Sequence, residues 1–214
     1  MKNIAIFGAG GFGREVKLII DAINKHNPHT YKLLGFFDDA FPKGKLINGL
    51  PILGGLTDLN NFSEDLAIAI SIGEPQLKKK IINKINNKQI SYPSLIHPNC
   101  SIGADEVFIG EGTIICEGTI LTCNIQIGNF AILNLYCTVG HDVTIGDYSS
   151  FMPSVNISGE VLIENAVYVG TGAKIINRLS IGENTIVGAG AIVSKSLPSN
   201  CTAVGIPAKP IKFH

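Results

Sequence analysis

The sequence predicts two domains of different class: an α/β Rossmann-like half domain over residues 1–90, followed by an all-β parallel β-helix over residues 91–214. Two observations lead to this fold class. A large apolar residue recurs at every sixth position from Ile109 to Val193, and a glycine-rich loop lies between a strand pattern and a helix pattern at residues 8–13. The first observation indicates a solenoid of stacked coils, and the second indicates a phosphate-binding turn.

The apolar repeat is unbroken over fifteen positions, which makes chance a poor explanation. These positions are Ile109, Ile115, Leu121, Ile127, Leu133, Val139, Ile145, Phe151, Ile157, Ile163, Val169, Ile175, Ile181, Val187 and Val193. The residue two places earlier is usually small or β-branched, as at Thr113 and Ala131. Because residues i and i−2 of a strand face the same side, each six-residue unit sends one large and one small side chain inward. Three units form one triangular coil, so the fifteen positions correspond to five coils.

Glycine follows the large residue at seven positions, for example at Gly110 and Gly140. We expect Gly or Asn at this place to occupy a corner that needs a positive φ angle. Ile96 and Ile102 extend the period backward before a seven-residue step, which places the first coil near Ile96.

Strand and helix patterns alternate in the first 90 residues, which implies a small parallel sheet covered by helices. Strands are expected at residues 3–7, 33–37 and 66–72, and helices at residues 14–24 and 76–86. Pro75 can begin the second helix, which is expected to have a basic outer face. The residues between the second and third strands are interpreted as a loop.

The loop Gly8-Ala9-Gly10-Gly11-Phe12-Gly13 matches the pattern G-x-G-x-x-G between a strand and a helix. In such a loop, backbone N–H groups and the helix N-terminus can face a phosphate. Asp38 ends the next strand, where a contact with ribose or base is usual. Only one mononucleotide half precedes the β-helix, so a mononucleotide-type ligand is favoured over NAD. The alternative is a tight turn that only allows close helix packing.

Two breaker residues, Pro93 and Pro98, mark the link between the domains. At the other end of the β-helix, residues 202–210 are expected to cover the last coil, which would otherwise present an unpaired strand edge.

Composition limits the class of partner and the compartment. The formal net charge is zero, which argues against nucleic acid or an anionic membrane as the main partner. The apolar runs are too short to span a bilayer, and the N-terminus begins a strand without a cleavable leader. The five cysteines form no C-x-x-C pair, and Cys137 falls at a small inward position, which indicates a buried thiol. We therefore expect a cytoplasmic protein.

One histidine falls where it could do chemistry. His141 comes two residues after a large repeat position, so its side chain should point outward from a corner and reach a neighbouring subunit. Asp142 follows directly, and a nearby carboxylate can orient an imidazole and raise its basicity. Asn134 follows Leu133 one unit earlier, and it is either a site residue or simply a left-handed corner. No metal is expected, because a zinc site needs three converging histidines and the others lie far away in the sequence.

Four motifs together resemble the bacterial sugar acyltransferases that include sialic acid O-acetyltransferases and nucleotide-sugar 4-N-acetyltransferases. They are Gly8-Ala9-Gly10-Gly11-Phe12-Gly13, Asp38-Asp39, Asn134 with Gly140-His141-Asp142, and Val204-Gly205-Ile206-Pro207-Ala208-Lys209. The resemblance implies a left-handed β-helix, a homotrimer, and acetyl-CoA in a groove between adjacent β-helices. It also implies that the N-terminal domain holds the nucleotide of the sugar.

The resemblance also suggests site residues by position. Substrate contacts are expected from Gly10, Gly11, Phe12, Asp38, Asp39 and Gly73, and CoA contacts, largely through backbone, from Ser150, Gly159, Thr171 and Ala189. The catalytic set is His141 with Asp142 and Asn134. Phe12 is a departure, because many N-acetyltransferases of this family have His at that position.

The function that the resemblance implies is transfer of acetyl from acetyl-CoA to the amine of a nucleotide-linked 4-amino-4,6-dideoxy sugar, in bacterial surface glycan synthesis, and we expect His141 to be the general base. Three alternatives remain open: an O-acetyltransferase acting on sialic acid or another sugar hydroxyl, a nucleotide-dependent oxidoreductase, and a non-catalytic β-helix scaffold or binding protein.

Overall fold

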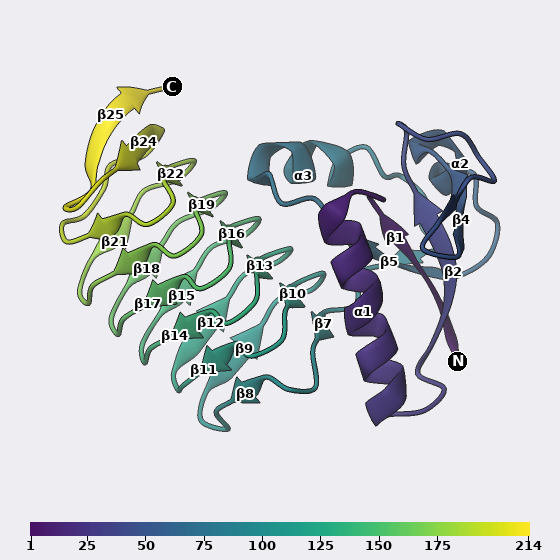
Figure 1. Ribbon diagram of the computed structural model, residues 1–214, viewed down its shortest axis with the longest axis horizontal. Helices are drawn as coiled ribbons and strands as arrows, with labels where there is room; N and C mark the ends of the chain where they lie inside the picture. Colours follow the sequence, from purple (N-terminus) through teal and green to yellow (C-terminus); the bar gives the residue numbers. More distant parts are fainter.

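The computed structural model describes all 214 residues, arranged as two parts side by side (Figure 1). A six-stranded sheet with helices forms the N-terminal part, and a stack of short strands forms a solenoid. The first sheet ends with β6 (Ile90–Ser91), and the solenoid begins with β7 (Leu95–Ile96). None of the helices has the length and apolar content that crossing a lipid bilayer requires.

The N-terminal sheet has the strand order β3-β4-β2-β1-β5-β6 and is parallel except between β3 and β4. Its strands are β1 (Lys2–Phe7), β2 (Tyr31–Phe37), β3 (Leu46–Ile47), β4 (Leu50–Gly54), β5 (Leu66–Ile70) and β6, and its helices are α1 (Gly11–His26), α2 (Leu56–Asn60) and α3 (Pro75–Ile82). Strand β5 is buried along its whole length, as expected for a parallel strand covered on both faces. The three strands and two helices predicted here are confirmed, with shifted ends.

The segment interpreted as a loop after the second strand is not unstructured. It contains the hairpin of β3 and β4, followed by α2. Asn48 and Gly49 form the two-residue turn of this hairpin, and both have positive φ angles, 47° and 80°. Asn-Gly between apolar residues is the strongest short-range signal for such a turn. The interpretation as a loop was therefore wrong, and the sequence contained the signal that would have corrected it.

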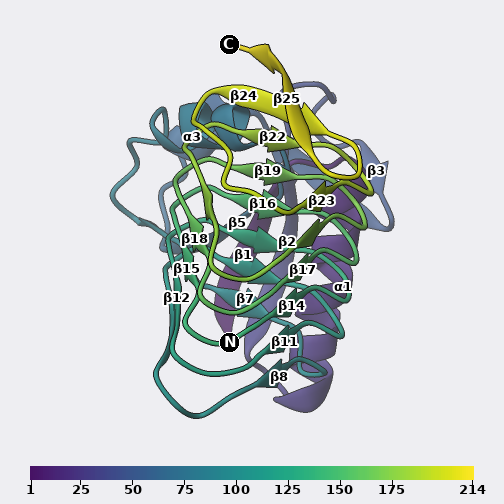
Figure 2. The ribbon, with the colours of Figure 1, turned by 90° about the vertical axis from the view of Figure 1, so that its left-hand side faces the viewer.

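The solenoid confirms the six-residue repeat, because each of the fifteen large residues is the last residue of a two- or three-residue strand. After β7 the strands are β8 (Ser101–Ile102), β9 (Val107–Ile109), β10 (Ile114–Ile115), β11 (Ile120–Leu121), β12 (Ile125–Ile127), β13 (Ile132–Leu133), β14 (Thr138–Val139), β15 (Thr144–Ile145), β16 (Ser150–Phe151), β17 (Asn156–Ile157), β18 (Leu162–Ile163), β19 (Tyr168–Val169), β20 (Lys174–Ile175), β21 (Ser180–Ile181), β22 (Ile186–Val187) and β23 (Ile192–Val193). Every third strand pairs in parallel, which gives three sheets around a triangular cross-section (Figure 2).

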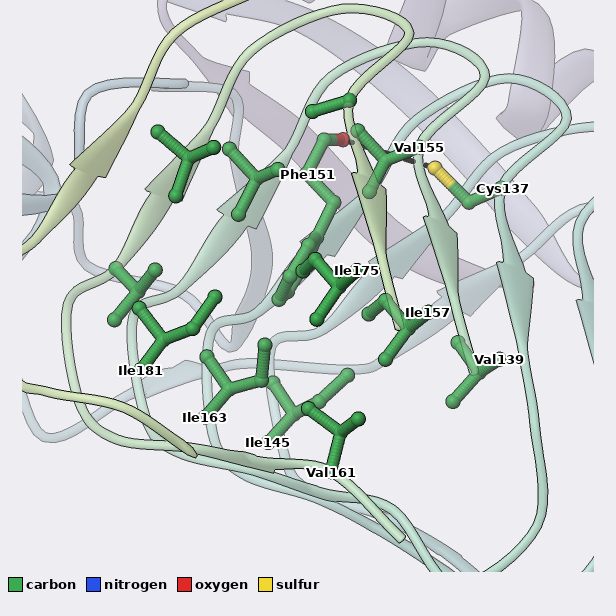
Figure 3. Close-up of a cluster of buried hydrophobic side chains, with 14 of the residues drawn as sticks. Cys137, Val139, Ile145, Phe151, Val155, Ile157, Val161, Ile163, Ile175 and Ile181 are labelled. Atoms are coloured by element: carbon green, nitrogen blue, oxygen red, sulfur yellow. Dashed lines mark hydrogen bonds between the residues drawn. The ribbon is translucent and has the colours of Figure 1, made fainter. Parts of the chain in front are cut away.

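The interior of the solenoid is one continuous apolar cluster. Phe151, Ile157 and Ile163 point inward from three different sheets of one coil, as Figure 3 shows, and all three are nearly inaccessible to solvent. Cys137 occupies one of the small inward positions, and its thiol is buried as predicted. Burial of this repeated apolar set is the main stabilising contribution to the coil stack.

The expected reason for the glycines at the corners is wrong. In every unit except the last, a positive φ angle occurs three residues after the large residue, for example at Asp142 and Tyr148, and not at the glycine that follows it directly. That glycine is needed for space instead. A Cβ on Gly110 would lie 2.5 Å from the carbonyl carbon of Gly128 in the next coil. Close approach of stacked backbones therefore selects glycine there, because any side chain would separate the coils.

Helix α1 covers the outer face of the first sheet of the solenoid, where β7, β10 and β13 begin (Figure 1). Leu95, Ile114 and Ile132 point outward from these strands, yet all are buried in one cluster with Val16 and Ile20 of α1. This apolar interface fixes the N-terminal part against the first three coils.

The C-terminal residues cover the last coil, as predicted. Strand β24 (Cys201–Val204) extends the first solenoid sheet, and Ala203 and Ala208 are buried in the solenoid core. Strand β25 (Lys209–Phe213) pairs antiparallel with β24 and is exposed along its whole length.

Helix α3 does not present only a basic outer face, because Lys78 points inward and is buried. Its ammonium Nζ donates a hydrogen bond to Ser150 Oγ on β16, at 2.9 Å. Burial lowers the pKa of Lys78 to about 7, against a smaller opposing effect of Glu74. A lysine at the boundary of the two parts is thus about half-protonated near pH 7.

Replacing Lys78 with Met should test this directly. In the unfolded chain Lys78 titrates near 10.5 and in the folded chain near 7, so between these values the unfolded state binds more protons. The free energy of unfolding of the wild type should therefore rise with pH relative to that of Lys78→Met, by about 1.4 kcal/mol per pH unit. Urea unfolding between pH 7 and 9 measures this difference.

Below pH 7 the folded protein carries a buried ammonium, so Lys78 lowers the free energy of unfolding most in this range, and the Met variant should be the more stable protein. Adding Ser150→Ala to Lys78→Met controls for the hydroxyl that has lost its donor. A stability difference that does not change with pH would show that Lys78 is charged in the folded protein.

Candidate active site

His141 and Asp142 form a hydrogen-bonded pair at the corner between β14 and β15. His141 Nδ1 lies 2.7 Å from Asp142 Oδ2, and the two side chains are 56% and 49% exposed. Because the carboxylate accepts the Nδ1 proton, the neutral imidazole keeps a free lone pair on Nε2. A general base needs this tautomer and this accessibility.

A second residue contacts the carboxylate of this pair. Asn124 Nδ2 donates to Asp142 Oδ1 at 2.9 Å. The hydrogen bond from His141 and, next, the one from Asn124 lower the pKa of Asp142 below its ordinary value. Sequence reasoning missed Asn124, although it precedes Asp142 by 18 residues and therefore lies in the same column, one coil earlier.

Gly159 lies one coil after His141 and makes room for the imidazole ring. A Cβ on Gly159 would lie 2.5 Å from both Cε1 and Nε2 of His141. The ring therefore rests against the backbone of Gly159, where a side chain would collide with it. Gly159 was predicted as a CoA contact, and the structure brings it next to the predicted base.

Asn134 lies at a different corner, between β13 and β14. Asn134 is buried, and its Oδ1 accepts the N–H of Leu135 at 2.7 Å. The interpretation of Asn134 as the left-handed corner is wrong, because Tyr136 adopts the positive φ angle in this turn. The side-chain Nδ2 of Asn134 remains the group that can donate to a ligand.

Asn134 and His141 do not converge within one chain. Strands β13, β14 and β15 belong to three different sheets, so the two corners lie on different edges of the triangular solenoid. A single site that uses both side chains therefore requires one residue from each of two adjacent chains.

The glycine loop contains glycines of two kinds. Gly8 has a φ angle of 103°, and a Cβ on Gly13 would lie 2.0 Å from the carbonyl oxygen of Gly8, so both are required by the turn itself. Gly10 and Gly11 have open space above them, and both are exposed. Only the latter two leave backbone accessible to a ligand. Phe12 packs against the apolar cluster between α1 and the first coils.

The two aspartates after β2 hold backbone segments in place. Asp38 accepts the N–H of Ala9 through Oδ2 and that of Ala40 through Oδ1, both at 2.8 Å. Asp39 Oδ1 accepts the N–H of Leu56 at the start of α2, at 2.9 Å. Asp38 thus fixes the glycine loop, a role that sequence reasoning did not assign to it.

Gly73 lines a groove of about 420 Å³ between α3 and the solenoid. Met152, Tyr168 and Ile186 line it together with Glu74. The Glu74 carboxylate accepts the N–H groups of Gln76 and Leu77 and so caps α3. The groove is suited to an apolar group beside Gly73.

The remaining predicted CoA contacts differ in accessibility. Thr171 and Ala189 are exposed at successive coils of the edge that carries Asn134. Ser150 is completely buried, and its hydroxyl is bound by Lys78. Thr171 and Ala189 therefore share one edge with Asn134. Gly159 shares another edge with His141.

Burial makes the thiols of Cys116 and Cys137 poor nucleophiles. All five are free thiols, and burial raises the pKa of Cys137 to about 12. The pKa of Cys116 is raised as well, again mainly by burial. No group of three His, Cys, Asp or Glu side chains is arranged to hold a metal ion.

Sequence comparison gives matches over each part and over the whole chain. Residues 3–85 match the family described as the PglD N-terminal domain. The GDP-perosamine N-acetyltransferase of Escherichia coli O157:H7 is 35% identical over 218 residues, covering 99% of this chain and 97% of that protein.

Two solved structures are similar over their full length. WeeI from Acinetobacter baumannii AYE has 35% identity and a TM-score of 0.88, with 99% of this chain and 100% of that chain covered. PerB from Caulobacter crescentus, in complex with CoA and GDP-perosamine, has 28% identity and a TM-score of 0.87, with 99% and 98% covered. These matches confirm the predicted fold class, including the left-handed β-helix.

The contact between His141 and Gly159 can be tested by substitution. In Gly159→Ala the added methyl group would occupy the space of the ring, so His141 should move and its hydrogen bond to Asp142 should break. We expect the Nδ1–H tautomer of His141 to be lost, as measured by ¹⁵N NMR of histidine side chains. The φ angle of Gly159 is not positive, so the backbone should tolerate Ala. An unchanged His141 spectrum in a folded variant would contradict the contact.

Proposed function

Because the chain belongs to the hexapeptide-repeat β-helix acetyltransferases that carry a PglD N-terminal domain, we propose that it acetylates the amine of a nucleotide-linked amino sugar. The acetyl donor is acetyl-CoA. The observation that carries the proposal is the exposed His141–Asp142 pair with Nε2 free, in a chain similar over its full length to an amino-sugar N-acetyltransferase.

The acceptor is a 4-amino-4,6-dideoxy sugar joined to a nucleotide, and GDP-perosamine is the first candidate. One full-length relative is named for this substrate, and another was solved with it bound. The open backbone of Gly10 and Gly11 at the start of α1 suits the pyrophosphate. Asp38 and Asp39 line the end of β2, where they are available to base or ribose through lone pairs not used in backbone hydrogen bonds.

His141 is the general base of the reaction. The acceptor amine attacks the thioester carbonyl of acetyl-CoA, and His141 Nε2 takes the proton that the nitrogen loses. Such proton transfer typically contributes about 10²–10⁴-fold to the rate. Asp142 keeps Nδ1 protonated and stabilises the imidazolium that forms. The tetrahedral intermediate then collapses with the CoA thiolate as leaving group, and no cysteine nucleophile takes part.

The active site is shared between two chains of a homotrimer, with His141 and Gly159 from one chain and Asn134, Thr171 and Ala189 from the next. This arrangement accounts for the distribution of these residues over two solenoid edges. CoA would lie in the groove between the edges, and the Nδ2 of Asn134 would donate to a substrate. Ser150 would take part only if Lys78 moved away from it.

Substitution of His141 tests the base. His141→Ala should fold and assemble normally, because the side chain is exposed, and it should lose at least about 10²-fold in kcat. KM values should change much less. Thiol release from acetyl-CoA with GDP-perosamine as acceptor measures both constants. Near-normal turnover in a pure variant would exclude His141 as the base.

Mixed assemblies test whether the site is shared. His141→Ala and Asn134→Ala chains should each be nearly inactive alone. Co-assembled in equal amounts, they should regain about a quarter of the wild-type sites, because each shared interface takes one residue from each neighbour. If both residues belonged to a site within one chain, mixing would restore no activity.

The acceptor is identified by a panel of GDP-, UDP- and dTDP-linked 4-amino sugars with free sialic acid as the hydroxyl control. Turnover with one nucleotide amino sugar, giving a product that resists hydroxylamine, supports N-acetylation. A hydroxylamine-sensitive product from a hydroxyl acceptor would contradict it.

A further inference from the structure

We propose that Asn124 is a positioning residue for acetyl transfer, which holds the Asp142 carboxylate in the orientation that keeps His141 Nε2 free. This inference rests on the proposed function, in which His141 is the base. It adds a third member to the pair, one that acts through its hydrogen bond to Asp142.

The geometry supports a relay of two hydrogen bonds. Asn124 Nδ2 donates to Asp142 Oδ1 at 2.9 Å, and His141 Nδ1 lies 2.7 Å from Asp142 Oδ2. Each carboxylate oxygen thus has its own partner. With one oxygen anchored to the coil, rotation of the carboxylate is restricted, and the other oxygen stays directed at the imidazole.

The backbone places the two residues in register. Asn124 and Asp142 have φ angles of 55° and 58° in successive coils of one edge. The Asp142 N–H also bonds to the carbonyl of Cys123, at 3.2 Å. Asn and Asp tolerate this left-handed conformation better than other side chains do. Both residues are therefore compatible with the corner, and the coil spacing brings their side chains within hydrogen-bonding distance.

The imidazole also rests against the next coil. A Cβ on Gly159 would lie 2.5 Å from Cε1 and Nε2 of the ring, and the backbone carbonyl of His141 accepts the N–H of Glu160 at 2.9 Å, which fixes the backbone from which the ring projects. The ring of an exposed histidine would otherwise sample several rotamers. Three successive coils, carrying Asn124, the His141–Asp142 pair and Gly159, thus define one orientation of the base.

The variant Asn124→Gly isolates the side chain, because glycine adopts a positive φ angle without strain. We expect kcat to fall about tenfold, a part of the 10²–10⁴-fold that a general base provides. The KM values for acetyl-CoA and GDP-perosamine should not change, because a residue that acts only through Asp142 affects the proton transfer and not the binding of either substrate. Asn124→Asp should be worse than Asn124→Gly, since it puts a second carboxylate against Asp142.

A matched control is available at another edge. Asn200 also has a positive φ angle, 56°, and its Oδ1 accepts a hydrogen bond from Asn184 Nδ2 at 2.9 Å. Asn200→Gly therefore removes an equivalent corner side chain and a stacked hydrogen bond away from His141. Its kcat should equal that of the wild type, so a loss specific to Asn124→Gly cannot come from the corner alone.

Two further readouts separate positioning from a general structural effect. In an Asp142→Gly background, Asn124→Gly should cause no additional loss of kcat, because its effect passes through the missing carboxylate. In the ¹⁵N NMR spectrum, the Nδ1–H tautomer of His141 should be less populated in Asn124→Gly than in the wild type.

An unchanged kcat in Asn124→Gly, or an equal loss with and without Asp142, would overturn the positioning role. Failure of the proposed function has a different signature, which is retained turnover in His141→Ala. The NMR measurement needs no turnover, so it tests the control of the His141 tautomer by Asn124 in either case.

Discussion

The coil spacing of the solenoid is the constraint on which the other features depend. Each residue lies beside the residue one coil later, and backbone hydrogen bonds between coils fix that relation. Side-chain hydrogen bonds follow the same rule, with a separation of 18 residues for Asn124 with Asp142 and for Asn129 with Asp147. A separation of one coil makes two residues neighbours on the solenoid surface, just as a separation of four residues does on a helix. It explains the glycines that permit close backbone contact between coils. It also explains why Asn124, Asp142 and Gly159 are placed to orient His141.

The fold could be predicted largely from sequence because the residues that are buried in the solenoid recur at a fixed spacing. An apolar residue every six positions can be read directly, and so can a glycine loop between strand and helix. The position of the positive φ angles could not be inferred in the same way. The expectation relied on glycine as a marker, but glycine here relieves contact between coils, while residues such as Asp142 and Tyr148 adopt the left-handed conformation. The Asn48-Gly49 hairpin was predictable from its turn residues.

The site was only partly predictable for a related reason. His141 and Asp142 are neighbours in sequence, so their pairing could be expected, and Asn124 would follow from the coil period once that period is known. The burial of Lys78 could not be foreseen, because it depends on how α3 lies against β16. The packing of α1 on the outward residues of the solenoid depends likewise on tertiary structure. The burial of such residues depends on how the N-terminal part packs against the solenoid, and no repeating pattern in the sequence reports that packing.

The coil arithmetic also bears on how such a chain can change its length during evolution. On the His141 edge, residues that contact each other lie one whole coil apart. A residue added at a corner can be absorbed there, as in the seven-residue step from Ile102 to Ile109, but a residue inserted within a strand would turn the following side chains to the wrong face. Duplication of a complete coil beyond Gly159 would instead leave Asn124, Asp142 and His141 in register and lengthen the solenoid by one step. Such a duplication would displace β24 and β25, and also Ile186 in the groove beside α3, while α1 would keep its contacts with the first coils. The number of strands in this architecture can therefore change only by whole coils if the stacked contacts are to be kept.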